Sequence, residues 1–425
     1  MHDKDSKERT DYYISKYIEV VKNKNDYILF NKMNGSIVSF NEDSVVFTDD
    51  SYFLRGINQS ECDFLKNYGF FDSEDLIRAE IKKLNEGTFI SDDVHITISV
   101  TESCNLDCSY CYQKNWNKND SIDKSTYKNM LIDYVYFVVE TFRNKKAQLD
   151  IHFIGGEPLC ERRLIEELTQ EILQIREMRA YSKIEFNFRM DTNLTLIDER
   201  FIRSFPNLEI CTALSMPEDH NALRSNSYND VIKKLLEIKD VFLEENYHLS
   251  IRYNVHSGNQ NDLDKFLELF SHYSIVCEIE VQNLINEGQT YFMNSLSDDR
   301  FEEKYVNEYI SILHRFGYET DILPKSGIGR HCFGQNVLSC KFYSNGQRVL
   351  CDAIPKSDGF SNQHFTVPFI EKLPEKCINC YDFPYCGGEK PCEKSKCNGI
   401  YSKKAINRAK IKQYAEMCEL VFSKE

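Results

Sequence analysis

The sixteen cysteines of this 425-residue chain are not spread evenly along it. Three lie within eight residues, at Cys104, Cys108 and Cys111, and nine more lie between Cys332 and Cys418. The amino terminus is polar and carries no export signal, so we expect a cytoplasmic protein whose thiols stay reduced. Ligation of metal ions or iron–sulfur clusters therefore explains both concentrations better than a disulfide framework does.

Charge and hydropathy exclude two classes of partner. The chain has 52 basic and 67 acidic residues, a net charge of −15 that repels a phosphate backbone, so we expect no nucleic acid partner. No window approaches the roughly 18 apolar residues of a membrane-spanning helix, so we expect no membrane partner. The length predicts two or three modules.

The first module, residues 1–92, carries a hairpin signal. Two strand-like runs, at 27–30 and 36–40, flank the turn dipeptide Asn34-Gly35. Amphipathic helical patterns follow the hairpin. We expect a small α+β domain of the winged-helix type.

The second module, residues 93–320, alternates short β-branched runs with amphipathic helices. The six runs are HITISV, IHFIG, KIEFNF, LEICTALSM, LSIRYNV and CEIEVQN. This pattern predicts parallel βαβ units, in an open sheet or an incomplete barrel, with the chemistry at the carboxyl ends of the strands. The third module, residues 321–425, is rich in cysteine and poor in periodicity. We therefore expect coordination by its cysteine ligands to stabilise its fold.

The spacing CxxxCxxC at Cys104, Cys108 and Cys111 comes one loop after the strand HITISV. Three thiolates leave one iron of a four-iron cluster open, and an open iron can chelate a small molecule. The alternative is a zinc site that takes a fourth ligand such as His95 or His152.

The next strand ends in the sequence GGEP, at Gly155, Gly156, Glu157 and Pro158, where two glycines let a ligand approach the backbone. Together with the CxxxCxxC loop, this motif resembles the radical S-adenosylmethionine superfamily over the middle 200 residues or so of the chain. The resemblance implies a partial (β/α)6 TIM-like barrel that cleaves S-adenosylmethionine to generate a carbon radical.

The resemblance also implies site residues. Cys104, Cys108 and Cys111 would hold three irons of a [4Fe-4S] cluster, and S-adenosylmethionine would chelate the fourth. Tyr110 would lie beside adenine, and Gly155, Gly156 and Glu157 would bind the methionine amino group. Thr192 and Asn193 would contact the nucleoside. Ser215 and Arg224 follow the next strand, and Arg224 would pair with the cofactor carboxylate.

The segment after the fourth strand departs from the family pattern. Relatives usually have Ser-hydrophobic-Asp-Gly there, whereas this chain has Ser215-Met216-Pro217. A surface salt bridge is the alternative role for Arg224. Thr192 and Asn193 could alternatively be turn residues without a ligand.

The tail resembles the SPASM extension, which implies two auxiliary [4Fe-4S] clusters and so three clusters in all. Cys332, Cys340, Cys351 and Cys392 would hold the first auxiliary cluster, and Cys377, Cys380 and Cys386 the second, with Cys397 or Cys418 as the fourth ligand. Five residues separate Cys386 from Cys392, where the family usually has three. A pair of structural zinc sites is the alternative.

SPASM relatives act on peptides, and the first module looks like the leader-binding module of ribosomal peptide maturases. The resemblance thus implies a maturase that forms a thioether or carbon–carbon crosslink in a ribosomally made precursor peptide, with a low-potential electron donor such as flavodoxin or ferredoxin. The alternative is an anaerobic sulfatase maturase that makes formylglycine, with Asp352 as its catalytic base. GGEP and Thr192-Asn193 argue against a non-enzymatic iron–sulfur carrier.

Overall fold

The computed structural model describes residues 12–48, 51–71, 90–111, 113, 121–284, 296, 300–301, 304–318, 336–349, 408, 410–412 and 414. The chain divides into two compact units. One comprises residues 1–87, 321–332 and 370–425, and the other comprises residues 88–320 and 333–369. The three domain ranges expected from the sequence stay predictions.

The first unit contains two small antiparallel sheets and a helix. One sheet has the order β2 (Ile18–Asn23), β3 (Asp26–Asn31), β4 (Ile37–Asn41), and the other has the order β1 (Tyr12–Tyr13), β6 (Ser51–Leu54), β5 (Val45–Thr48). A short 3-10 helix (Glu42–Ser44) precedes β5, and helix α1 (Gln59–Asn67) follows β6. The predicted hairpin is confirmed, because Tyr27 lies opposite Phe40 and Gly35 adopts a φ of 79° in the turn.

Buried side chains lie on both faces of the sheet β2–β3–β4. On one face, Leu29 packs with Leu54, Leu65 and Phe70. On the other face, Val21, Ile28 and Phe30 form a cluster with Ile411 from the carboxyl-terminal segment. The second face of this sheet is therefore covered by a residue that lies far away in the sequence.

The second unit is built on an eight-stranded sheet in the order β12-β11-β10-β9-β8-β7-β13-β14. Its strands are β7 (Asp93–Ser99), β8 (Ala147–Ile154), β9 (Ile184–Asp191), β10 (Leu208–Ala213), β11 (Tyr247–Val255), β12 (Glu278–Asn283), β13 (Cys340–Phe342) and β14 (Arg348–Val349). All six predicted strands are present as parallel neighbours. Two further strands were not predicted from the sequence: β13 runs parallel to β7, and β14 is antiparallel to β13.

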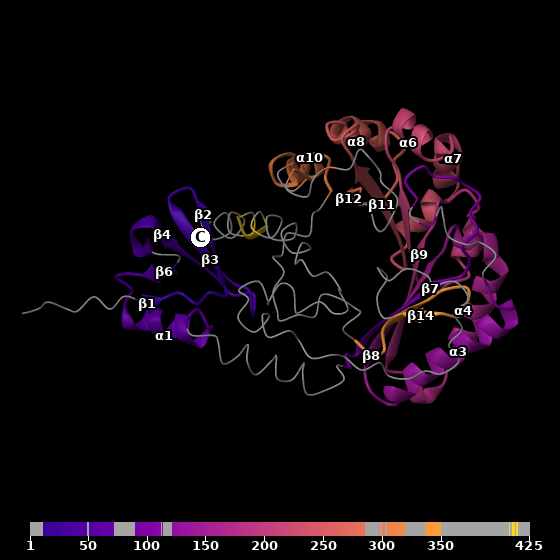
Figure 1. The fold of residues 1–425 in the computed structure, drawn as a ribbon, viewed down its shortest axis with the longest axis horizontal. Coiled ribbons are helices and arrows are strands. Elements are labelled where there is room, and N and C mark those ends of the chain that lie inside the picture. Colours follow the sequence, from indigo (N-terminus) through magenta and orange to yellow (C-terminus); the bar gives the residue numbers. More distant parts are fainter. Residues whose placement is uncertain are drawn as a thin grey trace, which may run out of the picture. The chain divides into compact units, whose positions relative to one another are not determined.

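Helices cover one face of this sheet (Figure 1). The helices of this unit are α3 (Lys124–Thr141), α4 (Arg162–Arg176), α5 (Glu199–Ile202), α6 (Pro217–Leu223), α7 (Tyr228–Ile238), α8 (Leu263–Ser271) and α10 (Ile310–Arg315). A π-helix (Tyr305–Tyr309) precedes α10, and 3-10 turns occur at Pro158–Glu161, Arg179–Tyr181 and Lys239–Leu243. Leu149, Ile151 and Phe153 of β8 point to the buried face. The unit is thus a mostly parallel α/β fold.

The opposite face of the sheet is polar, because alternate strand residues carry charge. On this face the Asp191 carboxylate lies 2.9 Å from His152 Nε2, 3.6 Å from Arg189 Nε and 3.7 Å from Arg252 Nη1. Burial opposes ionisation of Asp191, but His152 and the two arginines hold its pKa well below the usual range. A charged network therefore lines the inner face of the sheet.

No helix within the part of the chain that the structure describes is long and apolar enough to span a membrane.

Candidate active site

The three-cysteine loop begins where β7 ends, and its thiols lie close enough to one another to interact electrostatically. None of the three is in a disulfide, and all are half-buried. The backbone N–H of Leu106 donates to Cys104 Sγ at 3.4 Å. Burial raises the pKa of the Cys104 thiol, and Glu157 and the other two thiols raise it further. The raised pKa favours the protonated thiol. A bound metal would favour the thiolate instead, because a coordinating thiol is deprotonated.

The spacing of the sulfur atoms bears on which metal group they fit. Four thiolates around one zinc ion, each about 2.3 Å from it, lie about 4 Å apart. Within the described ranges, the one group with three ligand atoms all within 4.8 Å of one another is Asp93, His95 and Asp150, and the cysteines are not part of such a group. At least one pair of these sulfur atoms therefore lies more than 4.8 Å apart, which is wider than in a four-thiolate zinc site.

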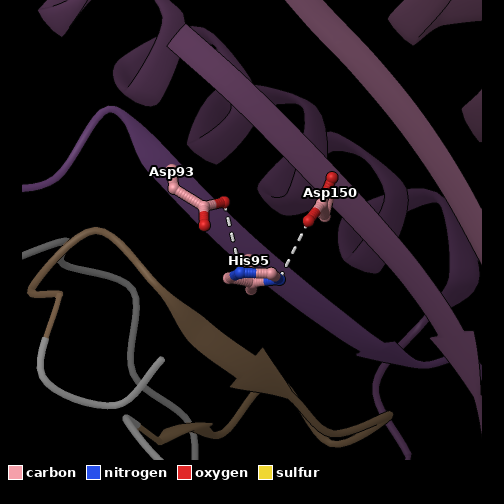
Figure 2. Close-up of side chains that lie close together, drawn as sticks. All are labelled: Asp93, His95 and Asp150. Atoms are coloured by element: carbon pink, nitrogen blue, oxygen red, sulfur yellow. Dashed lines mark ion pairs between the residues drawn. The ribbon is translucent and has the colours of Figure 1, made fainter. Parts of the chain in front are cut away.

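The two histidines considered as a fourth zinc ligand have carboxylate neighbours instead. Figure 2 shows His95 between Asp93 and Asp150, with its ring nitrogens 3.2 Å and 3.1 Å from their carboxylate oxygens. His152 faces Asp191 on the inner face of the sheet. Because His95 lies near the amino end of β7 and the cysteine loop follows its carboxyl end, His95 stands about 13 Å of strand away from that loop.

The backbone of the chain itself requires glycine at both glycine positions of GGEP. A Cβ on Gly156 would lie 2.4 Å from the carbonyl oxygen of Ser103, and one on Gly155 would lie 2.4 Å from that of Thr101. The N–H of Gly156 donates to the Thr101 carbonyl at 2.8 Å. These glycines let the backbone before Cys104 approach the end of β8, a close approach that the sequence analysis had assigned to a ligand.

Glu157 joins the ends of two neighbouring strands. Its side chain is 1% exposed, and its carboxylate accepts hydrogen bonds from Thr192 Oγ1 at 2.7 Å, Asn193 N at 2.7 Å and Leu159 N at 3.1 Å. Burial raises the pKa of Glu157, whereas these hydrogen bonds lower it. A carboxylate has about four acceptor positions, so these three leave about one for a ligand.

Thr192 and Asn193 directly follow β9, next to the cysteine loop. Asn193 Nδ2 lies 3.9 Å from Cys104 Sγ and donates to Asn105 Oδ1 at 2.8 Å. Asn105 in turn donates to Thr195 Oγ1 at 2.7 Å. Asn193 therefore makes contacts with the candidate cluster loop that a simple turn would not require, and Thr192 contacts Glu157.

Tyr110 and Arg224 meet at the same loop. The Tyr110 side chain forms a hydrogen bond with Asn254 at the end of β11, and burial raises its pKa. Arg224 donates from Nη1 to the Ala213 carbonyl and lies beside Cys108 and Tyr110. Its buried Nε has no hydrogen-bond partner among the residues that the structure describes. Arg224 is thus directed toward the cysteine loop, where a ligand carboxylate could take the remaining donor.

Ser215, which follows β10, is 8% exposed and lies near Asp219 of the next helix. Asp219 contacts His256 and Asn259, which lie beyond the end of β11. Asp219, His256 and Asn259 were not predicted from the sequence. The available signals were an acidic residue in the first turn after Pro217 and a histidine directly after the strand LSIRYNV.

Most of the predicted tail residues lie outside the described residues: Cys332, Cys351, Asp352, Cys377, Cys380, Cys386, Cys392, Cys397 and Cys418. Cys340 is the exception. It begins β13, is completely buried, and lies near Tyr127 and Tyr134 of α3. Its role as a cluster ligand stays a prediction.

Three curated relatives resemble parts of the chain. An uncharacterised protein of Methanocaldococcus jannaschii is 31% identical over 183 residues, 43% of this chain and 58% of that protein. The radical SAM cyclopropyl synthase TigE of Paramaledivibacter caminithermalis is 21% identical over 80% of this chain and 75% of its own length. The cysteine-type anaerobic sulfatase-maturating enzyme of Clostridium perfringens is 22% identical over 70% of this chain and 88% of its own length.

The fold has a counterpart among solved structures. Native anSMEcpe with bound AdoMet and the Cp18Cys peptide has a TM-score of 0.54 and 17% identity, over 78% of this chain and 100% of that chain. The model of the Radical SAM superfamily matches residues 98–270, which include the cysteine loop, GGEP, the Thr-Asn pair, Ser215 and Arg224. Residues 98–270 of this chain are therefore similar to the Radical SAM superfamily.

Proposed function

We propose that this chain is an enzyme that binds S-adenosylmethionine at a [4Fe-4S] cluster and uses it to modify a peptide. One observation carries the proposal: three mutually close thiols lie on the loop after β7, against the ends of β8 and β9. Cys104, Cys108 and Cys111 would bind three irons. The family match over residues 98–270 supports this assignment.

When bound, the cluster and S-adenosylmethionine would supply a carbon radical able to take a hydrogen atom from a substrate carbon. The chain's own residues bind and orient the cofactor. Arg224 would pair with the cofactor carboxylate through its free Nε, and the remaining acceptor position of Glu157, with the carbonyls of Gly155 and Gly156, would receive the amino group. Tyr110 would lie beside adenine.

The proposed substrate is a ribosomally made precursor peptide, which would receive a thioether or carbon–carbon crosslink. The likeness to TigE over 80% of this chain supports a radical enzyme of this kind. The cysteine-rich tail would hold two auxiliary clusters, and a low-potential protein such as flavodoxin or ferredoxin would donate electrons.

An edge strand in the first unit supports peptide capture. Two backbone hydrogen bonds flank the ends of β4: Asn31 N donates to Ser36 O, and Glu42 N donates to Asn25 O. In an antiparallel pair, the N–H and C=O groups of every second residue point toward the partner strand. The backbone groups of residues 37, 39 and 41 therefore face away from β3. Strand β4 has one partner among the described strands, so a leader peptide could add to it as a further strand.

The second candidate function is formylglycine formation by an anaerobic sulfatase maturase. The observation that favours it is the match to the Clostridium perfringens enzyme over 88% of that enzyme's length. Asp352 would then act as a general base.

Product mass separates the two functions. The reduced enzyme is incubated anaerobically with S-adenosylmethionine and one of two substrates: a candidate precursor peptide encoded by a neighbouring gene, or a cysteine-containing sulfatase peptide. A crosslink removes two hydrogens and joins two residues, whereas formylglycine replaces the cysteine sulfur with an aldehyde oxygen. We expect the crosslink. A formylglycine product that disappears in Asp352→Asn would establish the second function instead.

A further inference from the structure

Three side chains of types that bind metal ions meet near the amino ends of β7 and β8, whereas the cysteine loop follows the carboxyl end of β7. Asp93 and His95 are two residues apart on β7, so they share one face of that strand. His95 lies directly opposite Asp150 in the register of β7 and β8. The fold therefore brings together one imidazole and two carboxylates from two strands that helix α3 separates in the sequence.

The distances within this group suit a shared metal ion (Figure 2). His95 Nδ1 lies 3.1 Å from Asp150 Oδ2, and one ligand atom from each of the three residues lies within 4.8 Å of the other two. Two ligand atoms that are each about 2.1 Å from one ion lie about 3.4 Å apart in tetrahedral geometry. An ion could therefore replace the proton between His95 and Asp150 with little movement. A small rotation of Asp93, the most exposed of the three side chains, would add the third ligand.

The charges of this group do not balance. Two carboxylates face one imidazole ring, which carries at most one positive charge. Within the described part of the chain, no lysine or arginine forms an ion pair with Asp93 or Asp150. The group is therefore negative overall at neutral pH whether or not His95 is protonated. A divalent cation would supply the missing positive charge.

Neighbouring residues hold the candidate ligands in place. Asn187 of β9 donates from Nδ2 to Asp150 Oδ1 at 2.9 Å, and the other oxygen, Oδ2, faces His95. Hydrogen bonds from outer residues orient the ligands of metal sites in this way. The backbone N–H of His95 donates to Ser339 Oγ at 2.9 Å, so the start of β7 is also fixed from the side of β13. The three candidate ligands thus stand on paired strands rather than on a loop.

We propose that Asp93, His95 and Asp150 bind a divalent transition metal ion, with water at its remaining positions. One imidazole nitrogen and two carboxylate oxygens are ligands that zinc and manganese accept, whereas soft thiolates favour iron–sulfur clusters. His95 lies about 13 Å of strand from the cysteine loop, so this ion is separate from the proposed cluster. It would join β7 to β8 and stabilise the amino-terminal edge of the sheet, and this role does not depend on the proposed function.

Mn²⁺ is the probe for this site, because it prefers oxygen and nitrogen ligands to thiolates. It is titrated into the anaerobically reconstituted, unreduced and chelator-washed protein, and the EPR signal of free Mn²⁺ reports binding. Asp150→Asn keeps the shape of the side chain and removes its charge. We expect it to weaken Mn²⁺ binding at least about tenfold, since losing even an outer partner of a ligand costs about 10–100-fold. Glu278→Gln, at an exposed carboxylate that begins β12 on the same edge of the sheet, is the matched control.

Two further measurements keep the test decisive if Asp150→Asn fails to fold. Mn²⁺ should raise the melting temperature of wild type and of Glu278→Gln, because it binds the folded state. Pulsed EPR of wild type should show coupling of the bound Mn²⁺ to an imidazole nitrogen, and His95→Gln should lose this coupling. Equal Mn²⁺ affinity of Asp150→Asn and Glu278→Gln would overturn the inference. So would bound Mn²⁺ without nitrogen coupling in wild type, because His95 would then be only an ion-pair partner of the two carboxylates.

Discussion

The carboxylate of Glu157, directly after β8, accepts a hydrogen bond from the hydroxyl of Thr192, directly after β9, over 2.7 Å. The same carboxylate accepts from the backbone N–H of Asn193, whose side chain reaches Cys104. One buried acid thus connects two strand ends to the candidate cluster loop.

Glu157→Gln should therefore loosen this end of the sheet. The amide group of glutamine cannot accept where both carboxylate oxygens now do, so at least one buried N–H or O–H loses its acceptor. We expect a loss of about 1–3 kcal/mol of unfolding free energy, measured in urea, together with lower iron retention. Glu177→Gln, at an exposed glutamate at the carboxyl end of α4, is the control. Equal stability of the two variants would contradict this role of Glu157.

His220 should make the second unit sensitive to acid. Burial and the nearby charge of Arg224 together lower the pKa of His220 to about 3. A base whose pKa is lower in the folded state stabilises the fold above its unfolded pKa of about 6.5, and this stabilisation is lost as pH falls below that value. Between pH 7 and pH 5 the wild type should lose about 2 kcal/mol more than His220→Asn, as urea unfolding curves at the two pH values can show. A parallel decline of both proteins would contradict the assignment.

The carboxyl-terminal segment should stabilise the first unit. Ile411 is completely buried against Val21, Ile28 and Phe30. Ile411→Ala should cost about 2–4 kcal/mol and raise hydrogen exchange in β2 and β3, whereas Lys412→Ala, at an exposed neighbour, should leave exchange unchanged. Unaltered protection of β2 and β3 in Ile411→Ala would show that the packing contributes nothing.

Strand β4 should bind a leader peptide through its outer edge. Ser39→Pro removes an N–H that faces away from β3, so the hairpin should persist while strand addition is blocked. We expect the affinity for the precursor peptide to fall at least about tenfold, with Ser39→Thr close to wild type, in binding titrations. Equal affinities for the proline and threonine variants would rule out docking at this edge.

Local patterns made much of this architecture predictable. Each of the six parallel strands has its own β-branched run, and the cysteine loop and GGEP directly follow two of those runs, so sequence order alone placed them at one edge. Long-range pairings were not predictable. Strand β13 joins β7 from more than 230 residues away, and His256 meets Asp219 only because β10 and β11 are neighbours. The partners of such short polar segments depend on the completed sheet.

The most direct test of the central claim is the formation of 5′-deoxyadenosine from S-adenosylmethionine by the anaerobically reconstituted, reduced protein. Wild type should carry about twelve irons and form this product. The variant with Cys104, Cys108 and Cys111 changed to alanine should lose about four irons and form none. Tightly bound zinc with little iron in the wild type, or equal product from the triple variant, would contradict the account.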